Sequence, residues 1–178
     1  LIARVREIAA VVLSLVTREH SAPDVRRSTT RMISGPPVLR AAFPHHPLRL
    51  DPNAAWTPET SVKVATGLAG VLEYLEDPTP GLDGMAEVAR QSPMPLATNM
   101  CVVAFDQLAP AVAKQSVGVV LSDHHYWGGL QRSRLLAGIC VTFQLGLSMD
   151  SNSHLGISLA AMVHLAGLWG LISAVMGG

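Results

Sequence analysis

Oxygen-bearing side chains recur along the sequence at the ends of short apolar runs. The runs end at Asp51, Glu76, Asn99, Asp123 and Asp150, which are separated by 23 to 27 residues. One strand, one helix and two short loops need about that length, since a βαβ unit takes about 30 residues. Because the carboxyl ends of successive parallel strands meet at one edge, we expect these groups to line the mouth of a barrel, where such folds carry their chemistry.

The first three of these groups, Asp51, Glu76 and Asn99, are hard oxygen donors on adjacent predicted strand ends. Carboxylate and amide oxygens suit a divalent cation such as Mg²⁺, which keeps further positions for water or substrate. The alternative is that each side chain caps the helix that follows it, where Asp and Asn are common. The repetition of the pattern favours the metal site.

A regular alternation of strands and helices must position these groups. We predict strands at residues 48–51, 72–76, 95–98, 117–121 and 145–149. We predict helices at residues 58–74, 85–90, 105–114, 130–143 and 157–176, with a short helix ending at residue 43. Thr57 and Pro58 form a helix-start signal. The repeat of about 25 residues predicts an α/β barrel of parallel strands.

The composition bounds the class of protein. A chain of 178 residues is sized for one domain, and its 49% hydrophobic residues allow a large core. Thirteen basic and thirteen acidic residues cancel, so the chain lacks the positive charge that nucleic-acid binding requires. The two cysteines, Cys101 and Cys140, make neither a disulfide framework nor a zinc motif. We expect both to be buried thiols.

The two ends are less regular than the middle. Residues 4–16 form an apolar pattern that predicts a helix, and the Pro- and Ser-rich residues 21–37 predict a loop. We therefore divide the chain into residues 1–37, a helix plus loop, and residues 38–178, the barrel domain. Residues 156–178 are long enough to span a bilayer, but glycine, serine and histidine interrupt the run. We expect no membrane span, and a membrane anchor is the alternative.

Five motifs together resemble the glucarate dehydratase branch of the enolase superfamily, over about residues 38–166. The motifs are Leu48–Trp56, Tyr74–Pro78, Pro95–Met100, Val120–Gly129 and Ser148–His154. They are similar to segments that follow the third to seventh barrel strands of that branch. The resemblance implies an α/β fold, a partial (β/α) barrel of the TIM type with parallel strands inside and helices outside.

The resemblance also implies a function, a sugar-diacid dehydratase. Mg²⁺ would stabilise the enediolate formed when the α-proton is removed, before the neighbouring hydroxyl leaves. The implied metal ligands are Asp51, Glu76 and Asn99; the implied catalytic residues are Asp123, Asp150 and Asn152; the implied substrate-binding residues are Asn53, Ser151 and His125. The implied partner is a small sugar diacid. A cytoplasmic location, and a homo-oligomer or association with a related subunit, are expected.

The chain departs from that branch at two catalytic positions. Asp150 stands where the branch has a histidine, and a carboxylate beside Asp123 cannot replace an imidazole base. The branch's Lys-x-Lys pair has no counterpart, because the only two lysines, Lys63 and Lys114, fall on later helices. His154 is interpreted as a loop or helix-start histidine. A non-catalytic metal- or diacid-binding barrel remnant that associates with another subunit is therefore the alternative function.

Two adjacent histidine pairs, His45-His46 and His124-His125, raise the question of transition-metal sites. Neighbouring side chains on an extended chain point to opposite sides. We therefore expect neither pair to converge on a metal ion. A role at the barrel rim is the alternative for one histidine of the second pair.

Overall fold

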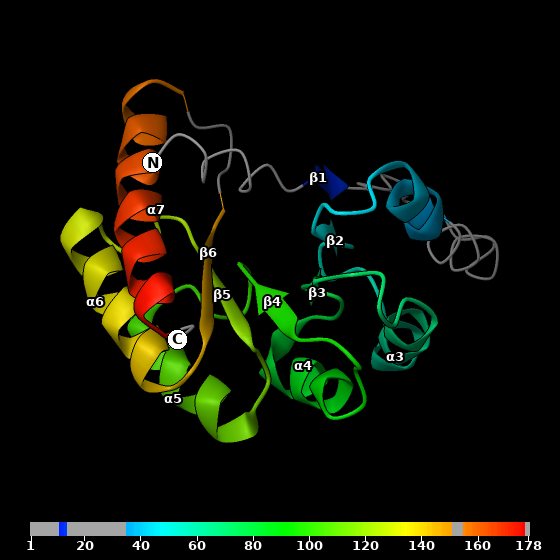
Figure 1. Cartoon of the computed structure of the whole chain (residues 1–178). Coiled ribbons are helices and arrows are strands. Elements are labelled where there is room, and N and C mark those ends of the chain that lie inside the picture. The colour runs from blue at the N-terminus through cyan, green and yellow to red at the C-terminus, as the bar shows by residue number, and fades with distance from the viewer. Residues whose placement is uncertain (1–10, 14–34, 151–154, 177–178) are drawn as a thin grey trace.

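The fold is a curved sheet of six parallel strands arranged in sequence order, β1 to β6 (Figure 1). The computed structural model describes residues 11–13, 35–150 and 155–176. The strands are β1 (Val11–Leu13), β2 (Leu48–Leu50), β3 (Tyr74–Glu76), β4 (Leu96–Thr98), β5 (Val119–Ser122) and β6 (Gly146–Met149). The sheet curls like part of a barrel. The predicted parallel α/β barrel is therefore confirmed.

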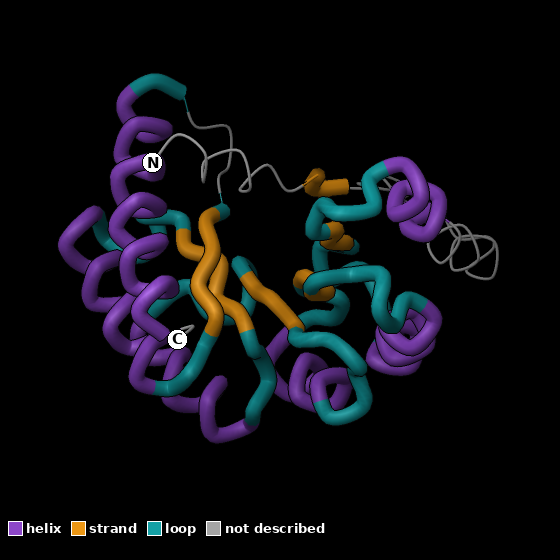
Figure 2. Tube along the Cα trace, viewed as in Figure 1, coloured by secondary structure: helices purple, strands orange, loops and turns teal. Residues whose placement is uncertain are grey.

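Helices cover the outer side of the curved sheet, as the purple and orange segments of Figure 2 show. Each strand from β2 to β6 is followed by one helix. These helices are α3 (Pro58–Gly67), α4 (Gly81–Ala89), α5 (Phe105–Lys114), α6 (Leu130–Thr142) and α7 (Ile157–Met176). The predicted alternation of strand and helix is confirmed throughout this part of the chain.

Helix α3 shows how the local sequence sets an element's limits. The hydroxyl oxygen of Thr57 accepts a hydrogen bond from the Thr60 amide at 3.3 Å, and Pro58 opens the helix as predicted. The predicted helix ran to residue 74, whereas the observed one ends at Gly67. Gly70, with φ of +73°, lies in the turn that follows. The early end gives the chain room to turn back toward β2.

The main core lies between the sheet and the helices. Alternate strand residues pack there against the helices, and all of the following are buried: Leu48, Leu50, Leu75, Leu96, Val120, Val64, Met85, Val88, Leu108 and Leu136. The strand residues between them form a smaller buried cluster of Tyr74, Ala97 and Leu121 on the concave side of the sheet. The alternation of the strands thus separates an apolar core from the concave face.

Strand β1 shows that the predicted helix at residues 4–16 is wrong at residues 11–13. This strand pairs in parallel with β2, Val11 with Leu48 and Leu13 with Leu50. Its two valines favour extended backbone, and the edge of β2 supplies hydrogen-bonding partners that are distant in sequence. The rest of the predicted helix lies outside the described residues.

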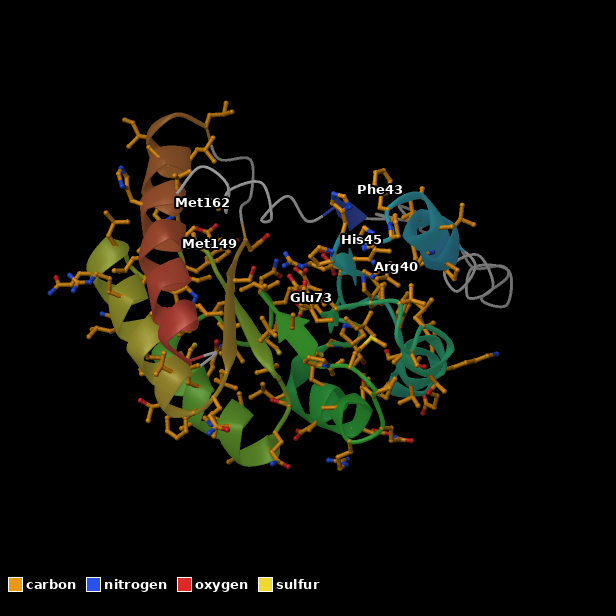
Figure 3. The ribbon with its side chains drawn as sticks, viewed as in Figure 1. Arg40, Phe43, His45, Glu73, Met149 and Met162 are labelled. Atoms are coloured by element: carbon orange, nitrogen blue, oxygen red, sulfur yellow. The ribbon has the colours of Figure 1, made fainter. Side chains whose placement is uncertain are left out.

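A further helix over residues 35–42 begins earlier than predicted. Pro36 and Pro37 both lie within this helix, so the predicted loop is wrong at residues 35–37. Arg40, labelled in Figure 3, donates from Nη2 to the carbonyl oxygen of Val71 at 2.6 Å. This bond ties the helix to the segment that leads into β3.

The prediction that both cysteines are buried is confirmed for one of them. Cys140 is buried on α6 as expected, whereas Cys101 is only partly buried and lies 3.2 Å from the Thr98 hydroxyl. Among the described residues, no helix has both the length and the apolar character that crossing a membrane requires.

Helix α6 offers a test of the core with a built-in control. Leu136 is 0% exposed, while its neighbour Leu135 is 60% exposed. We expect Leu136→Ala to lower the free energy of unfolding by about 2–5 kcal/mol, because it leaves a cavity. Leu135→Ala makes the same change in helix propensity and should stay within about 0.5 kcal/mol of the original chain. Urea unfolding measures both, and equal losses would contradict this assignment of the core.

Candidate active site

The ends of β2 to β6 bring five predicted groups toward the concave side of the sheet. They are Asp51, Glu76, Asn99, Asp123 and Asp150, each at the last residue of its strand or just after it. Residues paired across a parallel sheet point to the same face, and so do residues two apart along a strand. By the register of β2 to β6, these five side chains point to the same face as Tyr74, Ala97 and Leu121, the concave face of the sheet.

The side-chain amide of Asn99 joins carboxylates from two other strand ends. Its Nδ2 donates to Glu76 Oε1 at 3.2 Å and to Asp150 Oδ2 at 2.7 Å. These three residues lie 23 and 51 positions apart in sequence, so only the fold brings them together. Asp150 therefore belongs to the group formed by the first three strand ends.

Burial and the proximity of like charges shift the pKa values of the carboxyl groups at these strand ends. Burial, together with the smaller effect of the carboxylates of Asp51, Asp150 and Asp77, raises the pKa of Glu76 to about 8. Burial also raises the pKa of Asp51, against the opposing effect of a 2.7 Å hydrogen bond from the Asn53 amide. Several carboxylates in a poorly solvated place favour protonation or the presence of a cation.

Asp77 holds the next strand end in position. Its carboxylate accepts a hydrogen bond from the Thr98 hydroxyl at 2.5 Å and another from the backbone amide of Asn99 at 2.8 Å. Burial raises the pKa of Asp77 to about 6, although both hydrogen bonds oppose the shift. The sequence pattern predicts Glu76 as a ligand and Asp77 as a loop residue or a support for the ligands. It could not identify Thr98 as the partner of Asp77, because the two are 21 residues apart.

An arginine of β2, Arg49, acts on this group. Arg49 forms an ion pair with Glu73, labelled in Figure 3, at 2.9 Å. Its guanidinium carbon also lies 4.6 Å from the centre of the Tyr74 ring. Neither lysine of the chain is on a strand: Lys63 is on α3, and Lys114 is on α5, where it pairs with Asp83. No lysine of this chain therefore projects from the sheet.

A second group forms in the turn after β5. The carboxylate of Asp123, which is 2% exposed, contacts His125 Nδ1 at 2.9 Å and accepts from the His125 amide at 2.8 Å. On the other side of the ring, His125 Nε2 lies 3.2 Å from the Ser158 hydroxyl of α7. The aspartate predicted to orient a histidine thus contacts one, at position 125 instead of 150.

The adjacent histidines of this turn lie on the same side, contrary to the prediction. The rings of His124 and His125 have their centres 4.1 Å apart, because residues 124–128 form turns and not an extended chain. Within the described residues, one group of three His, Cys, Asp or Glu side chains has ligand atoms that all lie within 4.8 Å of one another: Asp123, His124 and His125. Metal binding by Asp51, Glu76 and Asn99 stays a prediction.

The other predicted site residues are less defined. Asn53 is exposed after β2, in a left-handed backbone conformation with φ of +52°. Ser151 and Asn152 lie outside the described residues, as does His154. Their predicted roles in substrate binding and catalysis stay predictions.

The comparisons with known proteins agree with this fold. A family model described as enolase C-terminal domain-like matches residues 24–173. A protein of Streptomyces coelicolor named probable glucarate dehydratase is 62% identical over 129 residues, which cover 72% of this chain and 30% of that protein. Muconate cycloisomerase 1 of Rhodococcus opacus is 29% identical over 67% of this chain and 33% of that protein. The chain spans about a third of these curated relatives.

Solved structures show the same arrangement. An enolase from Mycobacterium smegmatis complexed with tartrate is 83% identical, with a TM-score of 0.76, and the match covers 78% of this chain and 33% of that one. An enolase from Thermobispora bispora complexed with magnesium and formate is 64% identical with a TM-score of 0.76, over 78% and 33% of the two chains. On this evidence the chain belongs to the enolase C-terminal domain-like family and stands close to its glucarate dehydratase branch.

Proposed function

We propose that this chain supplies the metal- and diacid-binding part of a dehydratase of the glucarate dehydratase type. The observation that carries the proposal is the meeting of Glu76, Asn99 and Asp150 at the strand ends, with Asp51 close enough to raise the pKa of Glu76. The similarity to a protein named probable glucarate dehydratase supports the substrate class. The tartrate and the magnesium bound in solved relatives support a hydroxy-diacid ligand and Mg²⁺.

The donor set fits a hard divalent cation. Asp51, Glu76 and Asn99 supply carboxylate and carboxamide oxygens, which Mg²⁺ prefers. The raised pKa of Glu76, caused by burial and by neighbouring carboxylates, is the expected consequence of gathering these ligands without a counter-charge. Asn99 now directs its nitrogen at Glu76 and Asp150. Turning the carboxamide over would present its oxygen to the cation.

The chemistry divides between the cation and the chain's own residues. A divalent cation bound by these ligands would offset the negative charge that develops on a substrate carboxylate when the α-proton is removed. The base that takes this proton must come from the chain. We assign this role to His125, because its ring is held by the buried carboxylate of Asp123, as the ring of a catalytic imidazole commonly is.

The alternative proposal is a non-catalytic binding domain that associates with another subunit. It is favoured by Asp150, a carboxylate that accepts a hydrogen bond from Asn99 where the related dehydratases are expected to have an imidazole base. It is also favoured by the positions of both lysines on helices. A homo-oligomer or a related subunit as partner, and a cytoplasmic location, remain predictions under either proposal.

Metal binding can be tested by changing one ligand. We expect the chain to bind Mg²⁺ and Glu76→Gln to bind it at least about tenfold more weakly, because the variant loses an anionic ligand. Glu87→Gln, an exposed glutamate on α4, removes the same charge and should leave the affinity unchanged. Isothermal titration calorimetry measures all three. Equal Mg²⁺ affinities in the two variants, or no Mg²⁺ binding by the folded chain, would contradict the proposed metal site.

The raised pKa of Glu76 predicts how stability depends on pH without metal. Between the ordinary value near 4.5 and the folded value of about 8, the folded state holds a proton that the unfolded state has lost. Stability should therefore fall as pH rises through this range and level off above it. The fall is a few kcal/mol at most, since one pKa unit is worth about 1.4 kcal/mol.

Glu76→Gln separates this effect from that of Asp77. The variant should lose the fall in stability between about pH 6 and 8, because Asp77 titrates lower, at about 6. Saturating Mg²⁺ should remove the same fall in the original chain, since the cation favours ionised Glu76. Urea unfolding at a series of pH values checks both statements. An unchanged pH profile in Glu76→Gln would show that Glu76 is not the titrating group.

Position 150 distinguishes the dehydratase from the binding domain. We expect Asp150→His to raise the rate of Mg²⁺-dependent dehydration of glucarate or its idarate epimer by at least about tenfold, because a general base contributes about 10²–10⁴-fold. Asp150→Asn removes the charge without adding an imidazole and should give no such gain. Formation of the deoxy-keto diacid is the measurement. If neither variant turns over although both bind Mg²⁺, the binding-domain alternative holds.

A further inference from the structure

The turn after β5 places three metal-binding side chains together in a way that the sequence pattern did not predict. The ligand atoms of Asp123, His124 and His125 all lie within 4.8 Å of one another. Asp123 and His124 are buried, and the two imidazole rings are 4.1 Å apart. Tetrahedral zinc with bonds of about 2.0–2.2 Å places its ligand atoms about 3.4 Å from one another. Binding would therefore need only small shifts, including a slight opening of the 2.9 Å contact between Asp123 and His125.

The backbone of the turn holds this arrangement. The amides of Tyr126 and Trp127 donate to the carbonyl oxygen of Asp123 at 3.1 and 3.2 Å, and the amide of Gly129 donates to that of His124 at 2.7 Å. Gly129 has φ of +97°, a conformation that other residues rarely adopt. The three side chains are thus presented by a tightly bonded turn, so binding a cation requires little ordering of the chain.

The chemistry of this set differs from that of the first site. Two imidazole nitrogens and one carboxylate oxygen are ligands for Zn²⁺ and its neighbours Co²⁺ and Ni²⁺, whereas Mg²⁺ takes oxygen ligands. We propose that Asp123, His124 and His125 form a second metal site, selective for a transition-metal dication of the Zn²⁺ class. It uses none of the predicted Mg²⁺ ligands. A cation at the turn would occupy His125, so while it is bound that residue could not serve as the proposed base.

Ser158 supports the site from outside the set of ligands. A metal-binding imidazole usually engages its other ring nitrogen in a hydrogen bond that fixes the ring. With His125 Nδ1 beside Asp123, its Nε2 is the nitrogen that meets the Ser158 hydroxyl at 3.2 Å. Since Ser158 lies on α7, the helix that contacts α6 and β6, a cation at the turn would also be linked to this helix.

The test uses the full chain, freed of metal and titrated with Co²⁺ and Zn²⁺ in excess Mg²⁺. We expect bound Co²⁺ to give the visible absorption bands that are typical of a cobalt ion with four or five ligands. Added Zn²⁺ should abolish these bands, and Mg²⁺ should not. His125→Ala, at a largely exposed side chain, should weaken Zn²⁺ binding at least about tenfold, and Ser158→Ala by about tenfold. His45→Ala, in the other histidine pair, is the matched control and should leave the affinity unchanged.

Two results would overturn the proposal. One is equal Zn²⁺ affinity in folded His125→Ala and His45→Ala, with folding checked by circular dichroism. The other is displacement of Co²⁺ by Mg²⁺ in the original chain. Glu76→Gln keeps this test independent of the first site, because it should weaken Mg²⁺ binding and leave Zn²⁺ binding intact.

Discussion

Crowding of like charge at the open end of a parallel sheet is the constraint on which this site depends. Glu76 is 6% exposed, and the charges of Asp51, Asp77 and Asp150 act on it. In such a place the ionised form is costly unless hydrogen bonds or a cation compensate. Asn99 supplies one compensation by donating to two of the carboxylates. The rest of the negative charge makes the end of the sheet a site for cations or for protonated acids.

The parallel register explains why residues far apart in sequence share this constraint. The parallel arrangement of the strands could be predicted, because the apolar runs and the spacing of Asp51, Glu76 and Asn99 can be recognised in the sequence itself. The same features predicted α5 and α7 with their observed limits. The end of α3 could not be predicted in the same way, because nothing in the apolar pattern of residues 58–74 marks where the chain must turn toward β2. Such limits are set by the neighbouring strand.

Contacts between distant residues account for the other differences. Strand β1 forms because the edge of β2 offers backbone partners, which an apolar pattern at residues 4–16 does not reveal. The role of Asp77 depends on Thr98, which is 21 residues away. The prediction for the histidine pair at residues 124–125 assumes an extended chain. In the structure the turn places the two histidine rings on the same side. In the sequence, the glycines that follow the pair are the feature that indicates a turn.

The strand ends carry two groups of different chemistry. Asp150, which cannot act as an imidazole, bonds to Asn99 and adds its charge to the oxygen ligands of β2 to β4. Asp123 contacts His125 of its own turn, so its surroundings contain nitrogen as well as oxygen. An all-oxygen group favours hard cations and a mixed group favours transition metals. The two proposals therefore assign different cations to neighbouring strand ends of the same sheet.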